Sequence, residues 1–291
     1  MQVLRDIDAL REWREDAGFD ARRVGFVPTM GNLHVGHMAL IEHARRRAES
    51  VIASIFVNPL QFEDPDDLAR YPRTEERDLE KLQHAGVAAV FLPTEAVLYP
   101  NGQTDLVRVD AGPLGERLEG AARPGHFSGV ATVVTKLFNL VRPDVAVFGE
   151  KDAQQVAVIR RLVTDLDFPV ELAIEPTHRE PDGLAISSRN RFLSAGQRCQ
   201  APAVHRALKR AAESLAGGHT VAATLAGARH WLGQQGFEVD YLAYVDDARF
   251  EEQKRLVPHG RLVVAARLGD VRLIDNLAVH SPAPAMSESE R

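Results

Sequence analysis

Cysteine is almost absent from this chain, and its scarcity excludes two kinds of structure. Cys199 is the only cysteine among 291 residues. A single thiol cannot form a disulfide within the chain, and a zinc site built on several cysteines cannot be assembled. The sequence therefore indicates a fold that is held together by its buried core, which a chain of this length can supply.

Long apolar runs and an excess of positive charge are also missing. No stretch approaches the ~18 apolar residues of a membrane span, and the charged N-terminal residues contain no apolar signal-peptide core. The net charge is −6. A general nucleic-acid-binding protein normally carries an extended basic surface. We therefore expect a cytoplasmic protein that binds neither membranes nor nucleic acids.

Two common nucleotide-binding motifs are missing as well. No G-x-G-x-x-G follows a predicted strand, which disfavours an NAD-binding module. No G-x-x-x-x-G-K-[ST] phosphate loop is found either. A nucleotide would therefore have to be held in another way.

Short apolar runs alternate with amphipathic helical stretches in the first part of the chain. The runs predict strands buried on both faces, as in a parallel sheet, and they cover residues 23–29, 51–58, 87–93, 144–150 and 169–176. Helical stretches lie between them. This alternation predicts a Rossmann-like, doubly wound α/β domain over residues 1–176, with ligands bound beyond the carboxyl ends of its strands.

The sequence changes character after residue 176. A polar, glycine-containing loop precedes two alanine-rich helical stretches, at about 194–216 and 220–235, and three alternating strands follow them. We expect a smaller α+β domain over residues 177–280, acting as a lid. Residues 281–291 show no apolar pattern and are expected to form a disordered tail.

Two histidines stand three residues apart where the first predicted strand gives way to a helix. At this spacing His34 and His37 share one helix face, and Gly36 between them allows close approach to the backbone. A helix start also offers free N–H groups and a positive dipole end, which suit an anion. Three interpretations are open: a metal site, a phosphate site or two surface histidines. Val35 stands where an H-E-x-x-H zinc site has glutamate, which disfavours the first.

An ordered set of motifs extends this histidine pair. The run "VPTMGNLHVGHMALIEHA" resembles the H-x-G-H signature of nucleotidylyltransferases and class I aminoacyl-tRNA synthetases. With "SIFVNPLQF", "ARYPRT", "LEGAARPGHFSGVATVVTKLFNLVRPD", "FGEKDAQQ", "DGLAISSRNRFLS" and "LGDVRLIDN", it is similar to the pantothenate synthetase (pantoate–β-alanine ligase) family. The motifs run in family order from residue 26 to residue 276.

The resemblance implies an AMP-forming amide ligase. In this family pantoate and ATP form pantoyl adenylate and pyrophosphate, and the amine of β-alanine then displaces AMP. Neither step needs an enzyme nucleophile, so the site should contain positioning and charge-stabilising groups. The resemblance further implies a homodimer, and Mg²⁺ held mainly by ATP phosphates without a metal site on the protein.

The resemblance also implies which residues bind ATP. They are Met30, His34, His37, Gly149, Lys151, Asp152, Ser187, Ser188 and Arg189. Those expected to act in catalysis by binding or neutralising phosphate oxygens are His34, His37, Lys151, Ser187, Ser188 and Arg189. The last three lie in "SSRNRF", which resembles the superfamily loop usually written K-M-S-K-S. Two alternatives stay open: Asp152 as a plain helix cap, and a solvated Ser-Ser-Arg turn before a helix cap at Ser194.

Pantoate is expected to contact side-chain amides and a small apolar wall. The residues implied are Asn58, Gln61, Gln155, Val133 and Val134. Amides can both donate and accept hydrogen bonds, which suits a hydroxyl and a carboxylate. The two valines are equally expected as plain core residues of a helix. Arg123 and His126, in "RPGHF", are placed near the site by the resemblance without a role of their own.

Two other functions fit parts of the sequence. A nucleotidylyltransferase acting on a phosphorylated small molecule would share the H-x-G-H motif and would transfer AMP without releasing it. A noncatalytic RNA-binding remnant of a tRNA synthetase would share it too. The negative charge and the lack of a long helical anticodon-binding region disfavour this remnant.

Overall fold

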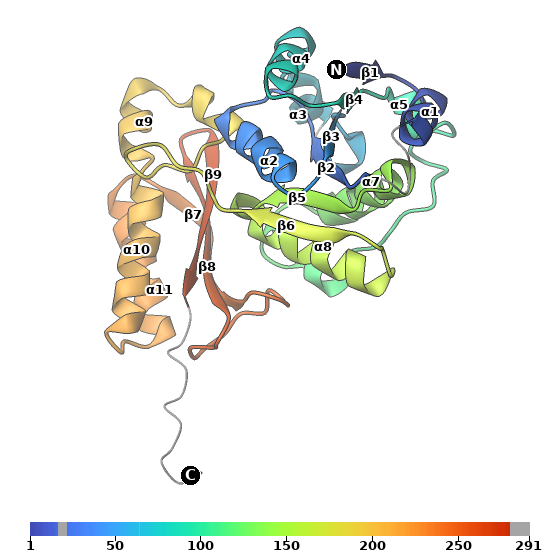
Figure 1. The fold of residues 1–291 in the computed structure, drawn as a ribbon. Helices are drawn as coiled ribbons and strands as arrows, with labels where there is room; N and C mark the ends of the chain where they lie inside the picture. The colour runs from blue at the N-terminus through green and yellow to red at the C-terminus, as the bar shows by residue number, and fades with distance from the viewer. Residues whose placement is uncertain (17–21, 64, 280–291) are drawn as a thin grey trace. The chain divides into compact units, whose positions relative to one another are not determined.

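The computed structural model describes residues 1–16, 22–63 and 65–279. Contacts divide the chain into two compact units, shown in Figure 1. The first unit contains Met1–His178 and Ile186–Ser188, and the second contains Arg179–Ala185 and the chain from Arg189 onward. The domain boundary expected at residue 176 and the lid role stay predictions, and the expected tail, 281–291, lies outside the described residues.

The first unit is built around a parallel sheet. Its strands are β1 (Gln2–Leu4), β2 (Val24–Thr29), β3 (Ser50–Ile55), β4 (Ala89–Phe91), β5 (Val145–Gly149) and β6 (Glu171–Glu175). They lie in the order β1-β4-β3-β2-β5-β6, and every neighbouring pair is parallel. The strand order reverses between β2 and β5, so the carboxyl ends of these two strands mark the expected ligand position.

One strand of the sheet was not expected. β1 pairs with β4 at the edge, with Gln2 opposite Ala89. Val3 is 40% exposed while Leu4 is buried, so this short strand lacks the continuous apolar run that marked the others. The helix that carries His37 therefore follows the second strand of the chain, and the prediction that it follows the first was wrong.

Helices cover both faces of this sheet, as expected for a doubly wound fold (Figure 1). They are α1 (Ile7–Asp16), α2 (Val35–Arg45), α3 (Pro65–Arg70), α4 (Glu75–His84), α5 (Glu95–Leu98), α6 (Glu119–Ala122), α7 (His126–Val141) and α8 (Ala153–Asp165). Within β2, Phe26 packs into the cluster formed with α1, α7 and α8, whereas its neighbour Val27 packs toward α2 and α4. This alternation explains why the central strands are apolar on both faces. No helix in the described ranges is long and apolar enough to cross a membrane.

The second unit is a small α+β structure. Its antiparallel strands are β7 (Glu238–Asp246), β8 (Gly260–Leu268) and β9 (Val271–Val279), and its helices are α9 (Ala195–Gln200), α10 (Ala203–Ala216) and α11 (Val221–Gln234). Leu208 of α10 and Tyr244 of β7 are fully buried in its core. The single helix expected at 194–216 is two helices, because Pro202 has no N–H for the helical ladder.

Candidate nucleotide-binding site

His34 and His37 lie at the start of α2, just beyond the carboxyl end of β2. His34 is the N-cap, with extended backbone at φ −129° and ψ 178°, and His37 is the third helical residue. The ring centroids are 4.0 Å apart and the ring planes are tilted by 37°. The backbone N–H of His34 donates to Nδ1 of His37 at 3.2 Å. In the neutral ring of His37 the proton is therefore on Nε2.

Both histidine rings are held in the neutral form. Burial, followed by the positive charge of Lys151, lowers the pKa of His34 to about 4. Burial also lowers the pKa of His37 to about 3, followed by the effect of positive charge on His34. Neutral imidazoles can donate hydrogen bonds to an anion. A phosphate is therefore a suitable ligand for this pair.

The turn before the histidines has two consecutive residues in the left-handed region. Gly31 has φ 79° and Asn32 has φ 50°. A Cβ on Gly31 would lie 3.1 Å from a carboxylate oxygen of Asp78 and 3.1 Å from a methyl group of Ile55, so glycine suits this position. The turn therefore has a specific backbone shape, and α4 packs directly against it.

Asp78 and Lys81 of α4 both bind this turn, and the sequence analysis did not find them. Asp78 is fully buried and accepts hydrogen bonds from the N–H groups of Asn32 and Leu33, at 2.7 and 2.8 Å. Nζ of Lys81 donates to the carbonyl oxygen of Leu33 at 2.5 Å. In a stretch as charged as residues 73–86, the only sequence signal was their three-residue spacing, which puts both on one helix face.

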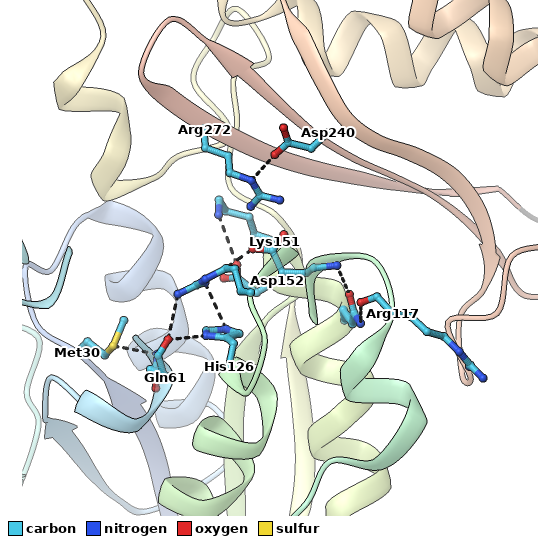
Figure 2. A network of polar contacts seen from close by, with 11 residues as sticks. Met30, Gln61, Arg117, His126, Lys151, Asp152, Asp240 and Arg272 are labelled. Atoms are coloured by element: carbon cyan, nitrogen blue, oxygen red, sulfur yellow. Dashed lines mark hydrogen bonds and ion pairs between the residues drawn. The ribbon is translucent and has the colours of Figure 1, made fainter. Parts of the chain in front are cut away.

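Lys151 and Asp152 follow the carboxyl end of β5, which is the strand beside β2. They lie in a short 3₁₀ helix, η3 (Glu150–Asp152), after Gly149 ends the strand. Nζ of Lys151 lies 3.6 Å from Oδ1 of Asp152, a contact shown in Figure 2. Asp152 occupies the N-cap position of α8 as expected, but its side chain makes no capping hydrogen bond. The cap interpretation is therefore right for the position of Asp152 and wrong for its side chain.

Gln61 is held beside Met30 at the end of a second 3₁₀ helix, η1 (Pro59–Gln61), after β3. Its Nε2 donates to the sulfur of Met30 at 3.1 Å, and its Oε1 accepts from Nδ2 of Asn58 at 3.1 Å. Figure 2 shows Gln61 between Met30 and His126. Because Oε1 already has a donor, the amide N–H₂ is the part of Gln61 best placed to bind a substrate oxygen.

Asn58 supports this arrangement from within the core. It is 1% exposed. Its Nδ2 donates to Gln61 and to the carbonyl of Gly129, and its Oδ1 accepts from the N–H of Leu60 and the hydroxyl of Tyr99. These four bonds use the full capacity of the amide. The structure therefore favours Asn58 as a support of Gln61 over a direct substrate contact.

Arg123 and His126, which the sequence left without a role, both bind the main-chain carbonyl of Gln61. Nη2 of Arg123 lies 3.1 Å from that oxygen and Nδ1 of His126 lies 2.9 Å from it. Burial, followed by the charge of Arg123, lowers the pKa of His126 to about 4, so the neutral ring donates from Nδ1. Both side chains thus anchor Gln61, Arg123 from the segment before α7 and His126 from the first residue of that helix.

The other residues expected at pantoate differ in their surroundings. Val133 and Val134 are 6% and 4% exposed and belong to the apolar cluster around α7, which is the core position that the sequence left open. Gln155 is half-buried in the first turn of α8. Its neighbour Gln154 is buried and donates to the carbonyls of Leu114 and Arg117, so the two glutamines have separate roles.

The Ser-Ser-Arg segment lies where the chain passes from one unit to the other. Ser187 and Ser188 group with the first unit and Arg189 with the second, and all three are half-buried. The helix cap expected at Ser194 is confirmed: its hydroxyl accepts from the N–H of Gln197 at 3.3 Å, and its own N–H donates to Oε1 of Gln197 at 2.8 Å. Contacts of this segment with ATP stay predictions.

No arrangement of three or more His, Cys, Asp or Glu side chains that could hold a metal ion occurs in the described part of the chain. The groups gathered at the carboxyl ends of β2 and β5 are neutral imidazoles, an ammonium group and backbone at a helix start. This donor set fits phosphate oxygens, which are anionic acceptors.

Sequence comparisons assign this chain to a family. A family model described as "Pantoate-beta-alanine ligase" matches residues 2–278. A protein named "Pantothenate synthetase" from Rhizorhabdus wittichii is 51% identical over 285 residues, covering 98% of this chain and 100% of the relative. Another of that name, from Pseudomonas aeruginosa, is 49% identical over 284 residues, covering 96% of this chain and 99% of the relative.

Solved structures agree with this assignment. Pantothenate synthetase from Thermus thermophilus superimposes with a TM-score of 0.89 at 48% identity, covering 97% of this chain and 100% of that one. The ligase from Francisella tularensis, complexed with "Beta-gamma ATP and Beta-alanine", gives a TM-score of 0.81 at 34% identity, covering 96% of this chain and 97% of that one. The chain described here belongs to the pantoate–β-alanine ligase family.

Proposed function

We propose that this chain condenses pantoate with β-alanine, using ATP, to give pantothenate, AMP and pyrophosphate through a pantoyl adenylate. The family membership over nearly the whole chain supports the reaction. The structural observation that carries it is the neutral pair His34 and His37 at a helix start, with the ammonium group of Lys151 close enough to lower the pKa of both rings.

The histidine pair would act on the phosphates of ATP. In the first step the pantoate carboxylate attacks the α-phosphorus, and negative charge grows on the phosphate oxygens as pyrophosphate departs. Donors fixed in place before the reaction stabilise such charge without reorganising. His37 is fixed in this way, because its Nδ1 accepts from the backbone N–H of His34, which leaves the proton on Nε2. Met30, Gly149 and the backbone at the helix start would line the nucleotide.

Lys151 would neutralise phosphate charge, and Asp152 beside it would orient the ammonium group or bind ribose. Mg²⁺, when bound with ATP, would neutralise charge on the phosphate oxygens and would take most of its ligands from ATP and water. Ser187, Ser188 and Arg189 would bind the same phosphates, with the planar guanidinium group suited to the departing pyrophosphate. We propose the second unit as the lid that carries Arg189.

Gln61 and Gln155 would bind pantoate. The sulfur of Met30 is a weak acceptor, so the amide N–H₂ of Gln61 can exchange it for an oxygen of pantoate at little cost. Asn58, Arg123 and His126 would keep Gln61 in place. Contact of Val133 and Val134 with the geminal methyl groups of pantoate stays a prediction.

The experiment that tests this function is an incubation with ATP, Mg²⁺, pantoate and β-alanine, in which each component is omitted in turn while AMP and pyrophosphate are measured. AMP release that requires all four components supports the ligase. Repeated pyrophosphate release without AMP, with a phosphorylated acceptor in place of pantoate, would instead support a nucleotidylyltransferase. We further propose that the chain forms a homodimer in the cytoplasm. Light scattering of the purified protein measures its mass in solution and so tests the dimer.

A further inference from the structure

Asp78 connects α4 to the turn that precedes His34. Its carboxylate is fully buried, and both oxygens are used: Oδ2 accepts from the N–H of Asn32 at 2.7 Å and Oδ1 from the N–H of Leu33 at 2.8 Å. The hydroxyl of Thr74, at the N-cap of α4, donates to Oδ2 at 3.0 Å. Burying a carboxylate is costly unless it is hydrogen-bonded. Three donors therefore fix the carboxylate in one orientation against the turn.

Lys81, three residues after Asp78 in α4, holds the same turn. Its Nζ donates to the carbonyl oxygen of Leu33 at 2.5 Å. Leu33 is thus held at both of its peptide groups, by the carboxylate of Asp78 at its N–H and by the ammonium group of Lys81 at its carbonyl. The residue is 2% exposed. Residues three apart on a helix share a face, so α4 presents both groups together.

The hydrogen bond from Lys81 is connected to the histidine pair through a single peptide group. The carbonyl that Lys81 binds and the N–H of His34 belong to the same peptide, and that N–H donates to Nδ1 of His37 at 3.2 Å. The turn itself contains the left-handed Asn32, a conformation that costs free energy in a non-glycine residue and persists where surrounding contacts enforce it. The hydrogen bonds from Asp78 and Lys81 of α4 are contacts that can enforce this conformation.

We propose that Asp78 and Lys81 are positioning residues of the adenylation step. Asp78 holds the N–H groups of Asn32 and Leu33, Lys81 holds the carbonyl of Leu33, and together they clamp the turn that places the ring of His34 where the α-phosphate of ATP reacts. This inference rests on the proposed function of the site. Lys81 has a second effect, because its positive charge is one of the causes that lower the pKa of His34 and His37. The catalytic contact itself is assigned to His34.

The first test is kinetic. A misplacement of about 1 Å can cost about 10²-fold in rate. Asp78→Asn puts an amide N–H₂ against the backbone N–H groups that the carboxylate now binds. We expect it to slow single-turnover adenylate formation by about 10²-fold. Lys81→Met removes one hydrogen bond to a charged group and should slow it by about tenfold or more, while Lys81→Arg should restore part of the rate. Glu76→Gln and Arg77→Met, at exposed positions of the same helix, are the matched controls.

A double-mutant cycle tests whether the clamp acts through His34. In a His34→Ala background, Asp78→Asn should lose most of its effect on adenylate formation, because the ring that it positions is gone. Full multiplication of the two effects would show that Asp78 acts elsewhere and would overturn the proposal. Thermal unfolding of each variant separates this outcome from loss of folded protein, and Lys81→Met tests the clamp if Asp78→Asn does not fold.

A readout that does not depend on activity distinguishes failure of the clamp from failure of the proposed function. Releasing the turn should let water reach the rings, so the pKa values of His34 and His37, measured by NMR titration, should rise from about 4 and about 3 in both Asp78→Asn and Lys81→Met. The control variants should leave them unchanged. Unaltered titration in both clamp variants would overturn the clamp, whether or not the wild-type chain makes pantothenate.

Discussion

The backbone N–H of His34 donates to Nδ1 of His37, and the two ring centroids are 4.0 Å apart. This bond fixes the ring of His37 and its tautomer, because Nδ1 must be the unprotonated nitrogen that accepts. Two histidines at this spacing on a surface helix would be free to adopt separate rotamers. The arrangement instead fits a pair that is organised before its ligand arrives.

His34→Ala and His37→Ala should each slow adenylate formation by about 10²–10³, roughly 3–4 kcal/mol, the usual cost of losing one transition-state donor. Single-turnover release of pyrophosphate measures this. The exposed His84, in α4, provides the matched control as His84→Ala. Near-normal turnover in both site variants would show that His34 and His37 are surface histidines without a catalytic role.

Three histidines with lowered pKa values should make the protein less stable as the pH falls. The pKa values of His34, His37 and His126 are lowered to about 4, about 3 and about 4 in the folded chain. Below the unfolded value of about 6.5 the unfolded chain binds protons that the folded chain does not. Their contribution to stability is therefore complete above about pH 6.5 and declines toward pH 4, by up to about 1.4 kcal/mol per pH unit for each ring.

Urea unfolding at pH 7, 6 and 5 measures this decline. His37→Gln cannot bind the proton in either state, so the dependence of its unfolding free energy on pH should be shallower than that of the wild type. Two carboxylates also contribute, because hydrogen bonds from histidine and arginine lower the pKa of Glu175 and Asp275 despite burial, but His37→Gln leaves both of them in place. An identical pH dependence in the variant and the wild type would show that His37 titrates normally.

Gln61 should lose its function when its backbone anchor is removed. Arg123→Met deletes one of the two donors to the carbonyl of Gln61 and adds no bulk. We expect a higher KM for pantoate with little change in the KM for ATP, because the lost hydrogen bond holds Gln61, which is proposed to bind pantoate and not ATP. Steady-state kinetics with each substrate varied in turn measures the difference. Equal increases in both KM values would indicate a general loss of structure.

Arg189→Lys should slow the first half-reaction more than the second. Lysine keeps the positive charge but loses the two-pronged geometry that suits departing pyrophosphate. Single-turnover kinetics of each half-reaction, with synthetic pantoyl adenylate for the second, measures both rates. If amine attack is slowed as much as adenylate formation, the pyrophosphate role is wrong and the segment is better described as a general lid.

The central strands and the second unit could be predicted from sequence because their patterns are local. Phe26 and Val27 face opposite sides of the sheet and are both buried, so β2 appears as a continuous apolar run. β1 could not be found in this way, since Val3 is exposed at the sheet edge. Pro202 was visible in the sequence, and it was the signal that the helical stretch from Ser194 would be interrupted.

The site was harder to predict where a role depends on partners distant in sequence. Asp78 resembles the acidic residues around it until its burial and its bonds to Asn32 and Leu33 are known. Asn58 was expected among the pantoate contacts, and only its four filled hydrogen bonds separate a supporting residue from a substrate contact. Spacing along the chain carries no information about such partners, because they come together only in the folded sheet.

The most direct test of the acyl-adenylate reaction follows oxygen from pantoate labelled with ¹⁸O in its carboxylate. When the carboxylate attacks the α-phosphorus, one of its oxygens becomes the bridge to phosphate and leaves with AMP when the amine attacks. We predict that the chain, given ATP, Mg²⁺ and labelled pantoate, releases pyrophosphate first and then, on addition of β-alanine, AMP that carries the label. Label retained wholly in pantothenate, with none in AMP, would contradict this reaction.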